Sequence, residues 1–474
     1  MNRLTLALVG AVGAALVATS SAAAFTPGDA YYAQQWYLGQ DNAFGAWAAP
    51  PTLDPVKVAI VDSGVDCSLS DFGGVGGQIA KVKSFVGGSA CMDTVGHGTI
   101  VAGEIAGELD TSGVVGLAYQ SKLLVAKVVG ADGMIPLKAE AAGIRWAVDQ
   151  GARVVNLSFG AVRDPLQPGL DGYSKIEAQA VAYAVKKGAV VVAAVGNSDE
   201  APQSPWPYAS WPSALPHVIG VGALTRSGKV PDFSDEDPVL VDMAAPGVGI
   251  FSTFPKDLTG LQPDCAEQGY TSCASGDYSK PQGTSFAAPQ VAAAAAVLFG
   301  VNPLLTSSQV TRILERHTND VNAQSGCDEC PNGRDKFSGW GSLDVAKAVD
   351  FLGSGSLPPS DSFEPNDKPS LAQKLWGNRP VVNATLDRWD DPVDVYSVRL
   401  ERGQLLRARM AAHWAHAIVG LSVFGKSTGK GVRTTHQGAT QKLSYRAPST
   451  GWYDVKLRTQ HHGGGRYVLQ LTKS

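Results

Sequence analysis

Between residues 56 and 352 the chain alternates short β-branched apolar runs with longer Ala-rich segments of helical spacing, and this alternation restricts the fold more than any other feature. The apolar runs predict strands at 57–61, 123–129, 153–157, 189–194 and 217–221, and the Ala-rich segments predict helices at 97–107, 137–150 and 174–187. This order predicts an α/β fold in which helices cover both faces of a parallel sheet. In such sheets the functional site lies at the carboxyl ends of the strands.

A different pattern begins after residue 352. Residues 353–362 are rich in Gly, Ser and Pro, which is typical of a linker. Beyond them apolar residues alternate with period two, as in Tyr396, Val398 and Leu400, and predict a small all-β sandwich over residues 363–474. That segment carries 17 Lys and Arg against 8 Asp and Glu, whereas residues 1–362 carry 22 against 35. The basic excess suggests contact of the sandwich with an anionic surface.

The N-terminus has the pattern of an export signal. Residues 1–24 hold Arg3, an apolar run over residues 4–18, and small residues that end in three alanines. The apolar run is shorter than the roughly 20 residues of a membrane span, and no later segment of the sequence resembles one. We therefore expect cleavage after Ala24 and a secreted, extracellular monomer with no transmembrane segment.

Export allows disulfides to persist, so the cysteines are expected to form bridges. Six cysteines allow about 15 connectivities. The shortest loops favour the pairs Cys67 with Cys91, Cys265 with Cys273, and Cys327 with Cys330. A zinc site at the last pair would need further ligands of the right type, and none is nearby in the sequence.

Three short motifs each place one polar side chain where a predicted strand ends or a helix begins. Asp62 ends the first strand, His97 opens one helix, and Ser285 opens another that is rich in alanine. A serine hydroxyl is a weak nucleophile, and it becomes reactive when a base takes its proton and an acid orients that base. Singly, each residue also suits a structural role as turn former, loop residue or helix cap. Together they predict nucleophilic catalysis by Ser285.

A side-chain amide ends another predicted strand. Asn197 follows the apolar run over residues 190–195. Acyl transfer needs donors aimed at the oxygen that becomes negative in the tetrahedral intermediate. Asn197 and the backbone N–H of Ser285 are therefore candidates for an oxyanion site, although Asn197 alone also suits a turn.

Taken together, the motifs around Asp62, His97, Asn197 and Ser285 resemble those of the subtilisin-like serine peptidases, the subtilase family, over residues 25–352. The acid, the histidine and the serine also occur in that family's order. The resemblance implies a three-layer fold with a mostly parallel seven-stranded sheet. It implies a serine endopeptidase that acts on proteins or peptides, with no organic cofactor and no nucleic-acid partner.

The same resemblance assigns substrate-binding residues around the slot for the residue before the scissile bond. They are Ser158, Phe159 and Gly160 on one wall, Ala193, Ala194, Val195 and Gly196 on the opposite wall, and Ser210 at the base. These residues are uncharged, so we expect an uncharged slot without a buried acid. We therefore expect a broad peptidase that prefers a large apolar or aromatic residue before the scissile bond. Phe159 also suits a role in core packing.

Some positions depart from the family pattern or extend it. Phe286 and Gln290 stand where Met and His are usual in the serine motif. Residues 25–36 resemble the mature start of thermitase-like members. The motifs that begin at Phe363, Asp391 and Gly451 resemble the bacterial pre-peptidase C-terminal domain.

The resemblance also implies structural calcium. Asp29, Asp71 and Asp110 match positions at which thermitase-like subtilases keep calcium ligands. Calcium takes about six to eight oxygens, so backbone carbonyls of residues 108–114 would complete the shell. The alternative is that these are ordinary turn and surface acids.

Two other functions fit parts of the sequence. A catalytically silent cell-surface binding protein would keep the peptidase scaffold and act through the basic sandwich. An α/β-hydrolase esterase would need the order Ser, acid, His and the motif Gly-x-Ser-x-Gly, whereas Ala287 stands two residues after Ser285. Every catalytic position of the peptidase motifs holds the residue type that the chemistry needs, and this favours the peptidase.

Overall fold

A computed structural model of the chain describes residues 24–74, 76–259, 271–273, 277–355, 357–389, 391–414, 416–434, 438–459 and 463–474. The expected export signal before Ala24 and the expected bridge of Cys265 lie outside the described residues. The elements of the first part are η1 (Tyr32–Gln34), α1 (Trp36–Gln40), β1 (Lys57–Asp62), η2 (Ser70–Phe72), β2 (Ile79–Ser84), α2 (His97–Ala106), β3 (Lys122–Lys127), α3 (Leu137–Asp149), β4 (Val154–Leu157), α4 (Lys175–Lys186), β5 (Val190–Ala194), η3 (Ser198–Glu200), β6 (Val218–Leu224), β7 (Met243–Pro246), β8 (Ser252–Thr253), α5 (Lys256–Thr259), β9 (Thr271–Cys273), β10 (Tyr278–Pro281), η4 (Thr284–Phe286), α7 (Ala288–Val301), α8 (Ser307–Arg316) and α9 (Val345–Leu352).

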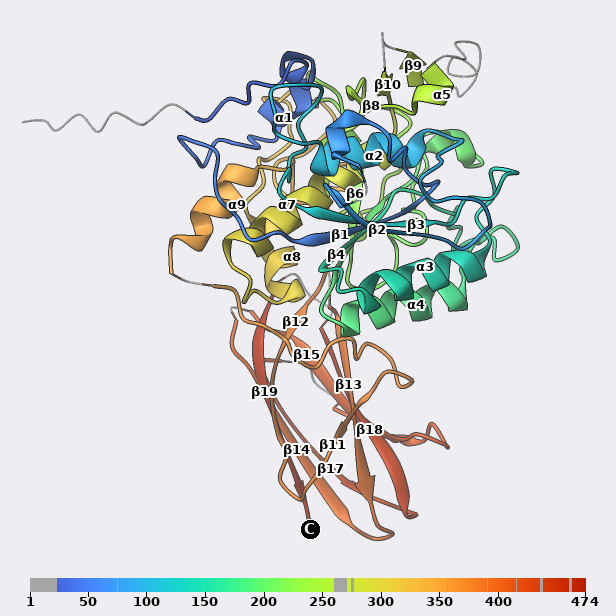
Figure 1. The fold of residues 1–474 in the computed structure, drawn as a ribbon. Coiled ribbons are helices and arrows are strands. Elements are labelled where there is room, and N and C mark those ends of the chain that lie inside the picture. Colours follow the sequence, from blue (N-terminus) through green and yellow to red (C-terminus); the bar gives the residue numbers. More distant parts are fainter. Residues whose placement is uncertain are drawn as a thin grey trace, which may run out of the picture.

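The first part is built around a seven-stranded sheet with the strand order β2-β3-β1-β4-β5-β6-β7. Every neighbouring pair in it is parallel. Helices α3 and α4 lie together on one face of the sheet, and α2 and α7 cover the other (Figure 1). Along β1, Val58 and Ile60 pack toward α2 and α7, whereas Ala59 and Val61 pack toward α3 and α4. The predicted three-layer α/β fold is confirmed.

The five expected strands coincide with β1, β3, β4, β5 and β6 within a few residues, and the three expected helices with α2, α3 and α4. Two further strands of the sheet, β2 and β7, were not among the expected elements. β2 is an edge strand whose residues are mostly half-exposed, so it lacks the continuous apolar run that marks the buried strands. β7 has only four residues, too few for a pattern.

Helix α7 runs through the core on the same face of the sheet as α2. Together with the preceding turn it forms the stretch Thr284–Val301, which is apolar and long enough to cross a membrane, but 89% of this stretch is buried inside the protein. Its alanines at positions 292–296 are at most 2% exposed, and their small side chains let neighbouring elements approach closely. The composition of α7 is therefore that of a core helix.

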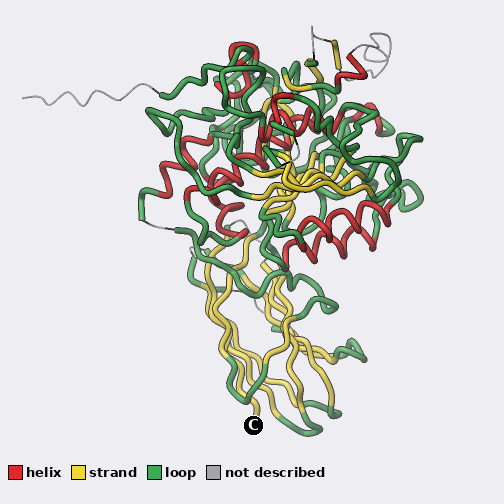
Figure 2. Tube along the Cα trace, viewed as in Figure 1, coloured by secondary structure: helices red, strands yellow, loops and turns green. Residues whose placement is uncertain are grey.

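The second part is a β-sandwich of two sheets, seen as the elongated yellow bundle in Figure 2. The sheets have the orders β11-β13-β18-β15-β16 and β12-β19-β14-β17. Their strands are β11 (Gln373–Leu375), β12 (Val381–Asp387), β13 (Val393–Leu400), β14 (Leu405–Ala412), β15 (Val419–Gly425), β16 (Gly431–Arg433), β17 (Thr440–Arg446), β18 (Gly451–Thr459) and β19 (Gly464–Lys473). Buried and half-buried residues alternate along β15, which is the period-two pattern that predicted this architecture.

Ion pairs join the sandwich to the first part. His217 Nε2, at the start of β6, lies 3.0 Å from Glu364 Oε2 and 3.2 Å from Asp367 Oδ1. Arg316 Nη2 of α8 lies 3.2 Å from Asp387 Oδ2 at the end of β12. These side chains are at most 28% exposed, so the pairs are largely shielded from solvent and fix how the two parts meet.

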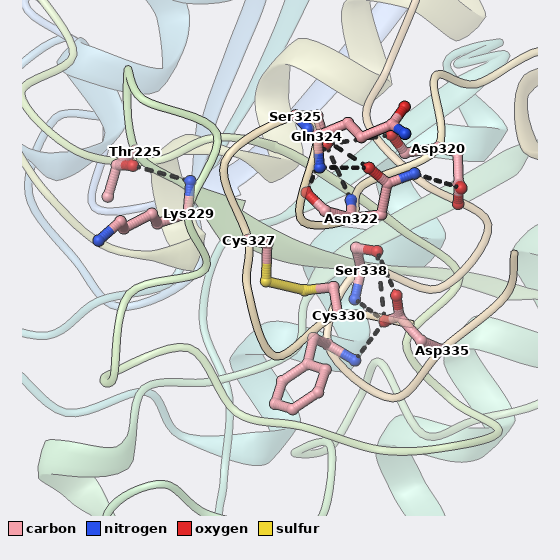
Figure 3. Close-up of a disulfide and its surroundings, with 11 residues drawn as sticks. Thr225, Lys229, Asp320, Asn322, Gln324, Ser325, Cys327, Cys330, Asp335 and Ser338 are labelled. Atoms are coloured by element: carbon pink, nitrogen blue, oxygen red, sulfur yellow. Dashed lines mark hydrogen bonds between the residues drawn. A yellow bond between two sulfur atoms is a disulfide. The ribbon is translucent and has the colours of Figure 1, made fainter. Parts of the chain in front are cut away.

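The structure contains two of the expected disulfides, Cys67–Cys91 and Cys327–Cys330. Figure 3 shows the second bridge in the loop between α8 and α9, beside a turn in which Asp335 accepts a hydrogen bond from the Ser338 N–H at 2.7 Å. Both sulfurs of this pair are used in the bridge, which excludes a zinc site there.

Candidate active site

Neighbouring parallel strands end next to the polar residues expected at the site. β1 ends at Asp62, β4 is followed by Ser158, and β5 is followed two residues later by Gly196 and Asn197. Because β1, β4 and β5 are adjacent in the sheet, their carboxyl ends lie at the same edge. Ser285 reaches this edge from η4, the turn directly before α7.

His97 is hydrogen-bonded to Asp62. His97 Nδ1 lies 2.8 Å from Asp62 Oδ1 and 3.0 Å from Oδ2. The side chain of Asp62 is 3% exposed and that of His97 is 17% exposed. An ionised carboxylate only accepts hydrogen bonds, so Nδ1 carries the hydrogen and Nε2 keeps its lone pair. Asp62 therefore fixes the tautomer in which Nε2 is available as a base.

The start of helix α2 is held by two residues that sequence reasoning missed. Asp93 Oδ2 accepts hydrogen bonds from the N–H and the Oγ1 hydroxyl of Thr99, at 2.9 and 2.7 Å. Ser63 Oγ accepts from the N–H of Gly98 at 2.9 Å. A Cβ at Gly98 would lie 2.1 Å from the carbonyl oxygen of Gly64, so only glycine fits. An Asp shortly before a predicted helix is a capping signal, and it would have identified Asp93.

Ser285 lies between the imidazole and the end of β4. Its Oγ donates a hydrogen bond to the carbonyl oxygen of Ser158 at 2.9 Å. The ring of the next residue, Phe286, has its centroid 5.1 Å from that of His97. Hydrogen bonds between catalytic groups often become short only when substrate binds. As a nucleophile, Ser285 would have to donate its hydroxyl hydrogen to His97 instead of to Ser158.

Asn197 is oriented by the residue before Ser285. Its Oδ1 accepts hydrogen bonds from the N–H of Thr284 at 3.0 Å and from the Thr284 hydroxyl at 3.1 Å. Among the described residues none accepts a hydrogen bond from Nδ2. A Cβ at Gly283 would lie 3.6 Å from Nδ2 and 3.7 Å from Oδ1, so the whole amide lies beside the turn that carries Ser285. The arrangement suits a donor for a developing oxyanion.

The two expected walls of the specificity slot differ in the atoms that can contact a substrate. Ser158 is buried, and Phe159 is half-buried and packs on the core beneath β4 and β5. Gly160 lies so close to Trp211 that a Cβ would be 3.0 Å from its carbonyl oxygen. On the opposite wall residues 193–195 are at most 3% exposed. Their side chains belong to the core, so only backbone atoms of that segment can face a substrate.

A buried carboxylate lies behind the base of the slot. Asp235 is 1% exposed, and it accepts hydrogen bonds from the hydroxyls of Ser210 and Ser198, both at 3.2 Å. A Cβ at Gly196, whose φ is 109°, would lie 2.3 Å from Asp235 Oδ2. The expected slot lining itself stays uncharged, and the acid lies behind it, covered by Ser210 and Gly196. Asp235 comes from a loop far along the chain and carries no sequence pattern that would place it there.

The carboxylates expected to bind calcium meet around the loop of residues 108–114. Asp29 Oδ1 accepts a hydrogen bond from the N–H of Asp110 at 3.2 Å, and Asp71 Oδ1 accepts one from the N–H of Val114 at 2.8 Å. Burial and then the charge of Asp110 raise the pKa of both Asp29 and Asp71. They are not among the described groups of three or more ligands whose atoms lie within 4.8 Å of one another.

A tighter carboxylate cluster lies where the sandwich meets the first part. Oxygens of Asp361, Glu364, Asp391 and Asp394 lie within 4.8 Å of one another. Burial and then the charges of neighbouring carboxylates raise the pKa of Asp391 and Asp394 well above the usual range. One oxygen each of Glu364, Asp391 and Asp394 is buried without a hydrogen-bond partner, as is the side chain of Asn366. This set of oxygen ligands fits a hard cation such as calcium.

Comparison with known proteins adds to this geometry. Residues 54–341 match the model of the subtilase family, Peptidase S8. Subtilisin DY of Bacillus licheniformis is 35% identical over 256 residues, which are 54% of this chain and 80% of that protein. The cell wall-associated protease of Bacillus subtilis is 33% identical over 319 residues, which are 63% of this chain and 31% of that protein.

Fervidolysin of Fervidobacterium pennivorans is 32% identical over 322 residues, which are 65% of this chain and 42% of that protein. Among solved structures, one of proteases from Pseudoalteromonas arctica superposes with a TM-score of 0.54 at 24% identity. The match covers 69% of this chain and 99% of that chain. At this identity the likeness supports the fold alone.

Proposed function

Because this chain belongs to the subtilase family and is a serine-type endopeptidase, we propose that Ser285 is its nucleophile, His97 its general base and acid, and Asp62 the residue that orients His97. The observation that carries this assignment is the 2.8 Å contact between His97 Nδ1 and the buried Asp62 carboxylate, at the edge of the sheet where Ser285 also lies. Such a contact leaves Nε2 as the base that a serine hydroxyl needs.

In the proposed reaction Ser285 Oγ attacks the carbonyl carbon of the scissile peptide bond while its proton moves to His97 Nε2. Asp62 stabilises the imidazolium that forms. The tetrahedral intermediate collapses as His97 gives the proton to the leaving amine, and an acyl-enzyme on Ser285 remains. Water, activated by His97, attacks the ester and releases the second product.

The negative oxygen of the intermediate would lie between Asn197 Nδ2 and the backbone N–H of Ser285. Asn197 suits this role because its Oδ1 is held by Thr284, so the amide needs no reorientation when charge develops. Substrate backbone would pair along residues 158–160, next to the Ser285 hydroxyl. The slot between these residues and residues 193–196 would receive the side chain before the scissile bond.

Labelling with a fluorophosphonate tests the assignment. Wild-type protein should react at one serine and lose peptidase activity, and Ser285→Ala should not be labelled. His97→Ala should fold normally but react far more slowly, because nucleophile and base act as one unit. Labelling of Ser285→Ala at an unchanged rate would overturn the assignment, and lack of labelling in the folded wild type would favour a catalytically silent binding protein.

We also propose that the protein is exported. The charged start, apolar run and alanines of residues 1–24 support removal of this segment, and the two disulfides suit an oxidising compartment. The proposed division is a peptidase domain over residues 25–352, a linker over 353–362 and the sandwich over 363–474. The family match ends at residue 341, so the likeness of the sandwich to the pre-peptidase C-terminal domain stays a prediction.

Calcium is the proposed structural cofactor. When bound, the ion would supply positive charge that neutralises crowded carboxylates. Asp361 of the linker and three carboxylates of the sandwich, Glu364, Asp391 and Asp394, would hold it, since their oxygens lie within 4.8 Å of one another. The site expected at Asp29, Asp71 and Asp110 remains a second candidate, and carbonyl oxygens of its loop would have to supply further ligands.

The proposed contact of the sandwich with anionic surfaces gains support from where its acids lie. Of its described acids only Glu401 is exposed, and the others are buried or largely covered. Among the described residues, the solvent-facing charge of the sandwich is therefore almost entirely basic. Binding to an anionic matrix should weaken as salt rises, because charges are screened over about 8 Å at physiological ionic strength.

A further inference from the structure

A groove runs between helix α4 and the first segment of the sandwich, residues 365–374, and we call it the α4 groove. Its volume is about 830 Å³. One wall comes from α4 together with Arg145 of α3, and the other comes from residues 365–374. The groove therefore exists only because the sandwich is docked against the peptidase domain.

The lining of the α4 groove is strongly cationic. Among the described residues that line it are five Lys or Arg side chains and no Asp or Glu. The five are Arg145, Lys175, Lys186, Lys368 and Lys374. Two carboxylates on the same elements already have partners, since Asp149 accepts a hydrogen bond from Tyr183 at 2.7 Å and Asp367 lies 3.2 Å from His217. A concave surface lined by one sign of charge concentrates ligands of the opposite sign.

Two tyrosines give the groove flat apolar surface between the charges. Tyr183 is held in place by Arg145, whose guanidinium lies 4.9 Å from the centre of its ring. Tyr173 also lines the groove and is 47% exposed. Aromatic rings with a polar tip beside cations suit a chain that carries both carboxylates and apolar groups.

A chain of contacting residues links the α4 groove to the proposed substrate-binding strand. The rings of Tyr173 and Trp211 lie 5.1 Å apart. Trp211 in turn pairs with Ala161 through two backbone hydrogen bonds of 2.8 and 2.9 Å. Ala161 directly follows Gly160, the last residue of that strand. A path of contacting residues thus connects the proposed active site to the groove.

We propose that the α4 groove binds an acidic stretch of the polypeptide substrate, outside the residues that flank the scissile bond. This inference rests on the proposed function. A polypeptide held in the active site presents its own flanking residues to the nearby groove at high effective concentration, whereas a separate glycan or other polyanion has no such advantage. The partner is therefore a protein with clustered Asp or Glu at a distance from an apolar cleavage site.

The test compares two peptides that share one apolar cleavage sequence and differ only in an extension of about five Glu or five Gln residues. A third, short neutral peptide without extension reports on basic peptidase activity. At low salt we expect the Glu peptide to have a KM several-fold lower than the Gln peptide, with little change in kcat, and we expect the difference to shrink at high salt.

The double variant Lys175→Gln/Lys374→Gln removes one charge from each wall. It should lose the preference for the Glu peptide while it cleaves the short peptide as wild type does. The matched control Lys430→Gln/Lys442→Gln removes two exposed charges of the sandwich that do not line the groove, and it should keep the preference.

Equal loss of preference in both double variants, or no preference in the wild type, would overturn the inference. So would an unchanged preference in the groove variant. If the groove variant loses binding to polygalacturonate but keeps the peptide preference, the occupant is a glycan and the inference is wrong. Failure of wild type to cleave the short peptide would instead contradict the proposed function, so the two failures can be told apart.

Discussion

Gln290 of α7 donates a hydrogen bond from Nε2 to Glu104 Oε2 of α2 across 3.0 Å, and both side chains are fully buried. The same amide nitrogen lies 2.7 Å from the carbonyl oxygen of Phe286 and 2.8 Å from that of Pro246, so its two hydrogens are shared among three acceptors. Helix α2 begins at His97, and Phe286 directly follows the proposed nucleophile. One side chain therefore ties the helix of the base to the turn of the nucleophile.

Gln290→Ala should lower kcat more than it changes KM, because the turn at Phe286 loses the hydrogen bond that holds it. It should also lower the free energy of unfolding by about 1–3 kcal/mol, since buried polar groups are left without partners. Burial raises the pKa of Glu104 well above the usual range and so favours its neutral form, and Glu104→Gln should therefore be tolerated. Kinetics on a short peptide and thermal melting check both variants. A wild-type kcat in Gln290→Ala would show that catalysis does not depend on the hydrogen bonds of Gln290 between α2 and the turn at Phe286.

The sequence predicted the parts of the site that follow strand and helix ends, because Asp62, His97 and Ser285 each stand at the boundary of an element with a clear periodicity. It identified Gln290 only as a departure from the family. Its partner Glu104 lies inside an apolar helix, and nothing local indicates that two helices distant in sequence bring these side chains together. Asp235 was missed for the same reason. Contacts made by tertiary packing leave no periodic pattern.

Asn197→Ala should reduce kcat with little effect on KM, because the lost donor acts mainly on the charge that develops in the transition state. Removal of one such donor costs roughly 3–4 kcal/mol in subtilisin, a relative of this chain, so the figure is borrowed from that enzyme. Steady-state kinetics with a peptide substrate measure the effect. Unchanged turnover in Asn197→Ala would contradict the oxyanion assignment.

A peptide library should show a preference for large apolar or aromatic residues before the scissile bond. Asp235 lies behind Ser210 and Gly196 at 1% exposure, so we expect its charge to be shielded from a bound side chain. Asp235→Asn should therefore leave the preference unchanged. A strict preference for Arg or Lys that disappears in Asp235→Asn would instead make this carboxylate the specificity determinant.

Glu140 and Glu177 should make the protein less stable as pH rises. Burial and then the charge of Glu177 raise the pKa of Glu140 to about 9, and burial raises the pKa of Glu177 to about 7. A carboxyl whose pKa is higher in the folded than in the unfolded state binds protons on folding. Its stabilising effect is complete below about pH 4.5 and is lost as pH rises toward 9.

Glu140→Gln should remove the loss of stability that Glu140 causes at high pH. It should raise the free energy of unfolding near pH 8 by on the order of 2 kcal/mol, with no gain near pH 4. Urea unfolding at both pH values measures the difference. The matched control is Glu329→Gln, an exposed carboxyl that should change little at either pH. Parallel stability curves for wild type and Glu140→Gln would show that the pair does not titrate in this range.

Removal of calcium should lower the melting temperature of the wild-type protein. An ion that binds only the folded state stabilises it by about 2.7 kcal/mol at 100 times its Kd. Without the ion, the carboxyls of Asp361, Glu364, Asp391 and Asp394 must repel one another or take up protons, and Asp391→Asn relieves part of that cost. In EDTA this variant should therefore melt at or above the temperature of the wild type, whereas in millimolar calcium it should melt below it.

The order of the two melting temperatures is thus expected to reverse between EDTA and calcium. This reversal distinguishes a cation site from an ordinary structural carboxylate, whose loss would lower the melting temperature in both buffers. Asp71→Ala separates the two candidate sites, because it should reduce the calcium effect only if the loop of residues 108–114 holds an ion. Magnesium serves as the control ion, since it binds poorly where several protein oxygens must replace its water. Wild-type melting curves that coincide in EDTA and in calcium would contradict both sites.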